Sequence, residues 1–96
     1  MIPIHRIPEH PGEILLEEFL VPLKMSQSAL ALHLGIPVQR INELVNGRRG
    51  ITPHTAWVLG VAFKTGPEFW MNLQVVYDLA RSREDAKDVK PIKRAG

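Results

Sequence analysis

The chain of 96 residues contains no cysteine, and this absence excludes several kinds of chemistry at once. Disulfide bonds, thiolate metal sites and cysteine nucleophiles all require the missing thiol. A small secreted domain usually depends on disulfides for its stability. A domain of this size without them is therefore expected in the reducing environment of the cytoplasm.

Long hydrophobic runs and strand-like alternation are also missing. No apolar stretch approaches the roughly 18 residues of a membrane span, and the N-terminus lacks the apolar core of a signal peptide, so no membrane association is expected. No segment alternates with period two, so strands are not expected. The chain is 45% hydrophobic and 23% charged, which is typical of a globular domain with one modest core.

Basic residues are scarce in the first half of the chain and gather near its end. Residues 1–46 contain three Lys or Arg and five Asp or Glu, whereas residues 47–96 contain nine and five. This asymmetry is compatible with contact to nucleic acid, although a solvated surface explains the charge equally well.

Proline and glycine divide the chain into five segments, and each has the pattern of a helix. The first, 13–21, repeats large apolar residues at four-residue spacing, and Pro22 is expected to end it. Ser26 is a suitable N-cap and Gly35 a suitable C-terminal residue for the second. The other helices are predicted at 27–34, 38–46, 53 to about 64, and 68 to about 83.

The second and third segments have the arrangement of a helix-turn-helix unit, at about residues 27–46. Only Gly35, Ile36 and Pro37 separate them, and two short helices joined by a short glycine-containing turn define this motif. Ala31 is small where the two helices must approach closely, and Gly35 permits a positive φ. A generic helical hairpin is the alternative, but the pattern favours DNA binding.

The exposed side of the third helix is rich in groups that pair with base edges. Amides bind adenine, arginine binds guanine, and a carboxylate accepts from the cytosine amino group. Apolar residues form its opposite side. We therefore predict base readout by Val38, Gln39, Arg40, Asn42 and Glu43.

Phosphate contacts are predicted on both sides of this helix. Two arginines follow it on a glycine-flanked loop, where they can bind phosphate or compensate the helix C-terminus. The start of the second helix also favours phosphate. The predicted contacts are Gln27, Asn46, Arg48 and Arg49.

Four stretches together resemble the HigA-type antitoxins, which are lambda-repressor-like, XRE-type helix-turn-helix proteins also known as virulence-associated protein I. They begin with His10-Pro11-Gly12-Glu13-Ile14-Leu15, Ser26-Gln27-Ser28-Ala29-Leu30-Ala31, Arg40-Ile41-Asn42-Glu43 with Asn46-Gly47-Arg48-Arg49-Gly50, and Pro67-Glu68-Phe69-Trp70-Met71-Asn72. The resemblance covers about residues 8–81. It implies an all-α, five-helix lambda-repressor-like domain that represses its own operon and neutralises a HigB-type, RelE-like mRNA endonuclease.

The last helix carries two apolar stripes on the predicted helical wheel. The second stripe consists of Met71, Val75 and Leu79. One stripe is enough to close the core, so the second is expected to form a homodimer interface that reads two half-sites of an operator. A broad core that takes both stripes is the alternative.

The toxin contact rests on the family resemblance alone. A basic nuclease would suit an acidic surface, and Glu13 and Glu17 lie in the acidic half of the chain.

Catalysis and metal binding have little support in the sequence. The four histidines have neither of the i,i+3 and i,i+4 spacings of a helical metal site, and no phosphate-binding glycine loop or nucleophile set is present. We expect no enzyme, no cofactor and no metal. The alternatives are a stand-alone regulator without a toxin and a helical interaction module that never binds DNA. The expected division is an N-terminal arm at 1–8, the domain at 9–83 and a mobile charged tail at 84–96.

Overall fold

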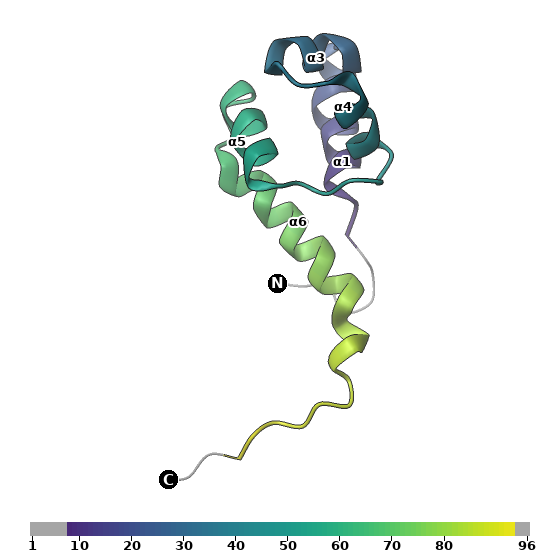
Figure 1. Ribbon diagram of the computed structural model, residues 1–96, viewed down its shortest axis with the longest axis vertical. Coiled ribbons are helices and arrows are strands. Elements are labelled where there is room, and N and C mark those ends of the chain that lie inside the picture. The colour runs from purple at the N-terminus through teal and green to yellow at the C-terminus, as the bar shows by residue number, and fades with distance from the viewer. Residues whose placement is uncertain (1–7, 94–96) are drawn as a thin grey trace.

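The computed structural model describes residues 8–93, and within this range the chain is helical with no strand (Figure 1). The N-terminal arm predicted at 1–8 therefore lies outside the described residues except for Pro8, as do the last three residues of the tail. None of the described helices is long and apolar enough to cross a membrane. The elements are α1 (Pro11–Ile14), a π-helical stretch (Leu15–Leu20), α2 (Val21–Leu23), α3 (Gln27–Leu34), α4 (Val38–Val45), α5 (Pro53–Ala62), α6 (Pro67–Ser82) and a 3-10 turn (Arg83–Ala86).

The predicted all-α fold with five helical segments is confirmed, because α1, the π-helical stretch and α2 form one continuous segment, here called the first helical segment. The helix starts also agree with prediction. Ser26 Oγ accepts from the amide of Ala29 at 3.0 Å, and Thr52 Oγ1 accepts from that of Thr55 at 3.3 Å. Side-chain oxygens thus satisfy amides that each helix leaves unpaired at its start. Gly35 follows α3 with φ 71°.

The prediction that Pro22 ends the first helical segment is wrong. The helix continues to Leu23 and stops at Lys24, whose φ of 54° is left-handed. Proline lacks an amide, and its ring collides with the carbonyl four residues earlier in a regular α-helix. Here the turns before Pro22 are π-helical, and the amide of Val21 bonds to the carbonyl of Leu16, five residues back. The wider turn gives the ring room, so the proline changes the helix type instead of ending the helix.

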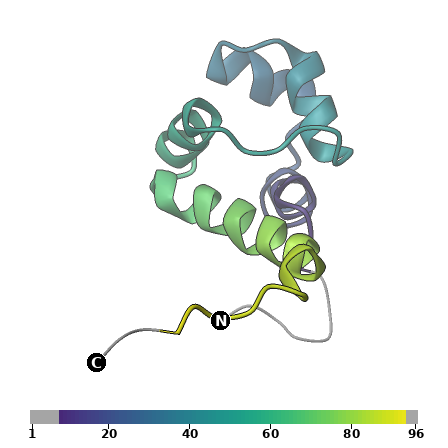
Figure 2. The same ribbon diagram turned by 60° about the horizontal axis from the view of Figure 1, so that its bottom comes forward.

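The core is enclosed by the first helical segment, α3, α4, α5 and α6; α6 packs against α5 and the first helical segment, and α3 and α4 lie on the opposite side of the domain from α6 (Figure 2). Trp70 is fully buried there and donates from Nε1 to Thr65 Oγ1 at 2.9 Å. The ring of Phe19 lies 5.1 Å from the ring of Trp70. The buried apolar residues are Leu15, Leu20, Leu30, Ala31, Ile41, Leu44, Ile51, Ala56, Leu59 and Trp70.

The three residues of the second apolar stripe of α6 differ in their exposure. Met71 packs against the core, whereas Val75 and Leu79 are 46% and 49% exposed. Met71 is more covered because α5 packs along the first half of α6. There Met71 lines one hollow together with residues of α5. The unpartnered part of the stripe is therefore Val75 and Leu79.

A backbone contact between the first helical segment and α4 fixes the position of α4. The amide of Gly12 donates to Nδ1 of buried His10 at 2.9 Å. Gly12 itself lies so close to the carbonyl of Leu44 that a Cβ at this position would overlap its oxygen. The His10 ring also packs edge-on against Tyr77 of α6, with ring centroids 4.9 Å apart. Residues 10–12 thus join three helices.

We expect Gly12→Ala to lower the free energy of unfolding by about 3 kcal/mol or more, because a methyl group forced against a backbone carbonyl costs more than one against a side chain that can move. Gly35→Ala is the matched control, since open space surrounds Gly35 and only its left-handed φ is strained. That strain costs about 1–2 kcal/mol. Urea unfolding of both variants checks this, and a smaller loss for Gly12→Ala would mean that the contact is loose.

Stability should fall as the pH drops below about 6.5 because of His10. Burial lowers the pKa of His10 from 6.5, Glu13 and Asp78 oppose this shift, and Arg81 adds to it. The native state therefore favours neutral His10, and its contribution to stability is complete above the pKa of the unfolded chain and lost below it. A protonated Nδ1 also cannot accept from Gly12. Melting temperatures between pH 7.5 and pH 5 check this, and a pH dependence that His10→Asn leaves intact would have another source.

Candidate nucleic-acid interface

α3 and α4 form the predicted helix-turn-helix. The amide of Ile36 bonds to the carbonyl of Ala31 at 3.1 Å, which closes the turn after α3. Ile41 and Leu44 point into the core and are almost fully buried. Because an α-helix has 3.6 residues per turn, burying these two positions leaves residues 39, 42 and 46 on the outer side of α4.

The residues predicted to read bases share one helix but differ in exposure. Val38, Gln39 and Asn42 are exposed, whereas Arg40 and Glu43 are half-buried. Both keep accessible surface, and their role in base readout stays a prediction. Nε of Arg40 is buried and has no hydrogen-bond partner among the described residues.

An ion pair joins α4 to the loop that follows it. Arg49 donates from Nη2 and Nε to Glu43 Oε1, at 3.0 and 3.2 Å. The chain reverses at Gly47, whose φ is 73°, and the amide of Arg48 bonds back to the carbonyl of Glu43 at 2.8 Å. This reversal brings Arg49 over α4. A polar hollow of about 220 Å³ beside the pair is lined by Pro37, Gln39, Arg40, Glu43 and Arg49.

The sequence reasoning missed this pair, because the six-residue spacing crosses the end of a helix and follows no helical rule. The glycine after α4 was the available signal. A helix that ends at a left-handed glycine turns its chain back over the last turn. A residue two positions beyond Gly47 can then reach Glu43.

The two amide side chains of α4 also have partners. Asn42 Nδ2 donates to Gln27 Oε1 at 3.2 Å, which links α4 to the start of α3. Asn46 Nδ2 donates to the backbone carbonyl of Asn42 at 3.0 Å. All three amides keep exposed or half-exposed surface. Arg48 is exposed and forms no side-chain hydrogen bond or ion pair with the described residues.

Glu13 and Glu17 are exposed on the first helical segment. With Glu9 they form an exposed acidic cluster, in which one carboxylate oxygen from each residue lies within 4.8 Å of the others. His33 and His54 are exposed, and neither joins this cluster. His5 lies outside the described residues.

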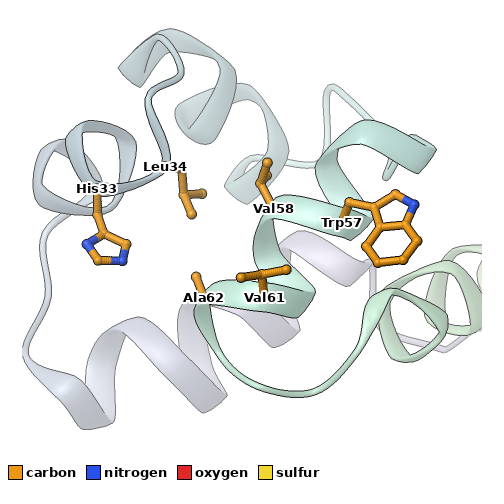
Figure 3. A pocket seen from close by; sticks show the side chains of 6 residues that line it. All are labelled: His33, Leu34, Trp57, Val58, Val61 and Ala62. Carbon is orange, nitrogen blue, oxygen red and sulfur yellow. The ribbon is translucent and has the colours of Figure 1, made fainter.

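A second feature that the sequence reasoning missed is an apolar hollow of about 330 Å³ between α3 and α5. Figure 3 shows Trp57 and His33 at its two ends, with side chains of both helices between them. Trp57 is 59% exposed and Val61 is 71% exposed. The hollow is lined by His33, Leu34, Trp57, Val58, Val61 and Ala62.

The helix-turn-helix family model matches residues 16–70 of the chain. Virulence-associated protein I of Dichelobacter nodosus is 43% identical over 83 residues, which are 86% of this chain and 77% of that protein. The structure of an addiction module antidote protein of the HigA family from Coxiella burnetii is similar with a TM-score of 0.83 and 44% identity, over 91% of this chain and all of that one.

The antitoxin HigA of Pseudomonas aeruginosa, solved with the higBA promoter, is similar with a TM-score of 0.82 and 37% identity. The match covers 90% of this chain and 99% of that one. Identity at this level over nearly whole chains confirms the resemblance drawn from the sequence motifs. The chain therefore belongs to the helix-turn-helix family and, within it, to the group of HigA-type antitoxins and virulence-associated proteins.

Proposed function

We propose that the protein is the antitoxin of a toxin–antitoxin pair, which binds operator DNA to repress its own operon and neutralises a HigB-type mRNA endonuclease. The observation that carries the DNA-binding part is the outer side of α4, where exposed amides stand beside a half-buried arginine and a paired carboxylate. A similar protein was solved with its promoter. The protein acts by binding, not by catalysis, in the cytoplasm that holds its operator.

In this proposal α4 enters the major groove, as the second helix of the motif does in such proteins. Gln39 and Asn42 present exposed amides to adenine edges, and Val38 presents an apolar contact to a thymine methyl group. Arg40 lines the polar hollow beside the ion pair, and its half-exposed side chain suits a base or phosphate acceptor there.

The two neighbouring arginines take different roles. Arg48 is exposed and unpaired within the described chain, so it suits a phosphate. Arg49 holds the Glu43 carboxylate with two hydrogen bonds. A bare carboxylate beside DNA would be repelled by phosphates, and the ion pair reduces that repulsion while it orients Glu43 towards a cytosine amino group. We therefore retain Arg48, with Gln27 and Asn46, as phosphate contacts, and propose that Arg49 acts mainly through Glu43.

We expect Gln39→Ala to weaken binding to the operator by about 1–3 kcal/mol while changing binding to unrelated DNA little, because a base contact is lost. Arg48→Ala should weaken binding to both and flatten the slope of log K against log salt by about 0.9, because one phosphate contact is lost. Fluorescence anisotropy titrations at several salt concentrations separate the two effects. If both variants lose affinity for operator and unrelated DNA alike, α4 does not read sequence.

We propose a homodimer that forms through the exposed side of α6, around Val75 and Leu79, with Met71 at its edge. Two exposed apolar side chains one turn apart support this, because a two-fold operator needs a two-fold protein.

Val75→Glu should convert the dimer to a folded monomer, because it places a charge on each side of the two-fold axis. Operator affinity should then fall far more than the loss of one contact explains, since the two half-sites are filled independently. Sedimentation equilibrium with circular dichroism checks this. The buried Trp70 remains untouched, so an unfolded variant would place Val75 in the core, and a folded, unchanged dimer would move the interface elsewhere.

Toxin neutralisation rests on the family, and the acidic cluster is the surface that suits a basic nuclease. The double variant Glu13→Lys with Glu17→Lys should lose protection against the toxin while it keeps operator binding, because both side chains are exposed and neither belongs to α4 or to the loop after it. The control is Glu84→Lys with Asp85→Lys, which changes the net charge equally at another exposed site. Growth rescue in cells that express the toxin is the measurement. Full rescue by the Glu13 and Glu17 variant would remove the cluster from the interface, and absence of a toxin partner altogether would leave a stand-alone repressor.

A further inference from the structure

A groove of about 540 Å³ separates α6 from the first helical segment and the residues before it. Its walls are apolar side chains of both sides, namely Ile14, Phe69, Leu73 and Val76. Phe69 is 38% exposed, although a phenylalanine at this point of an amphipathic helix would ordinarily be covered.

The rim of this groove is negatively charged. Glu9 lines it, and Glu9 belongs to the acidic cluster with Glu13 and Glu17. All three carboxylates are exposed. The groove therefore offers apolar walls and an acidic rim to a segment that is apolar and basic.

The C-terminal tail, residues 87–93, has this composition. Its apolar residues Val89 and Ile92 are 72% and 90% exposed, Lys87, Lys90 and Lys93 recur every three residues, and Asp88 is the one acidic residue. The tail leaves the end of α6 as an extended chain that leads away from the helices (Figure 1). Two large apolar side chains on an extended segment bury nothing in their own chain, so they are available to a partner.

We propose that the C-terminal tail of one copy of this protein packs into the groove between α6 and the first helical segment of a second copy, with Val89 and Ile92 against the apolar walls and Lys90 and Lys93 beside Glu9. A second copy is the occupant because the tail leads away from its own groove and because Val75 and Leu79 are exposed on the same helix that forms one wall of the groove. The inference rests on the homodimer proposed above, and it adds a contact that reaches beyond α6.

The absence of cysteine allows a direct test in the full-length protein. Ile92→Cys places a thiol on the tail, and Val76→Cys places one in the groove. When the two purified variants are mixed and gently oxidised, we expect a disulfide-linked species of twice the chain mass that contains one chain of each kind. Val61→Cys is the control partner for Ile92→Cys, because Val61 is 71% exposed on α5 but lies outside the groove, and this mixture should give several-fold less mixed species.

The double variant Ile92→Cys with Val76→Cys distinguishes the two possible sources of the tail. At low protein concentration, a disulfide within a single chain would mean that the tail folds back on its own groove, and would overturn the proposal. A yield of mixed species equal to that of the Val61→Cys control would overturn it as well.

Sedimentation of Ile92→Glu completes the test. We expect the dissociation constant of its dimer to be about tenfold higher than that of the parent dimer. Val61→Glu carries the same charge at an exposed position outside the groove, and its dissociation constant should match that of the parent. A parent that is monomeric would refute the homodimer itself. A parent dimer that Ile92→Glu leaves unchanged would refute only the tail contact.

Discussion

The backbone of Gly12 lies directly against the carbonyl of Leu44, and the placement of α4 depends on this contact. Side chains do not separate the two helices at this point, so their distance is set by backbone atoms, which cannot change rotamer. His10 supports the arrangement from one side, because its Nδ1 accepts from the Gly12 amide while its ring packs against Tyr77. α4 is therefore held against the first helical segment, which His10 joins to α6, although α4 is only eight residues long. An isolated helix of this length would not be stable.

The outer side of α4 shows how partners within the protein prepare polar groups for a ligand. Asn42 is held by Gln27, and Glu43 is held by Arg49. Each bond is exposed and contributes little to folding stability. Its effect is to restrict the rotamers of side chains that would otherwise lose that freedom on binding, and a smaller entropy loss favours the complex. Arg48 and Arg49 are adjacent in sequence, but only Arg49 pairs with Glu43, because the reversed chain directs only Arg49 over α4.

Much of the fold follows from local signals in the sequence. Ser26, Gly35 and Thr52 mark helix ends through their own hydrogen bonds or backbone conformation, and such signals need no knowledge of the rest of the molecule. The failures have a different origin. Pro22 is compatible with a helix here because the preceding turns are π-helical, and no local signal in the sequence marks that change of helix type. Met71 and Val75 belong to one stripe by periodicity, and only the neighbouring α5 decides that Met71 is covered. The pairing of Arg49 with Glu43 needed the path of the loop, which spacing along a helix cannot provide.

The contact between Gly12 and Leu44 also has a consequence for how the two ends of this small domain communicate. The residues proposed to meet a toxin lie on the same helical segment as Gly12, one and five positions further along the chain. A protein that pulls on this segment must either carry α4 with it or open a backbone contact that has no alternative packing. Because linkage between two binding sites is reciprocal, occupancy of the operator would resist the same displacement. The contact between Gly12 and Leu44 is thus the point at which a load on the first helical segment reaches α4.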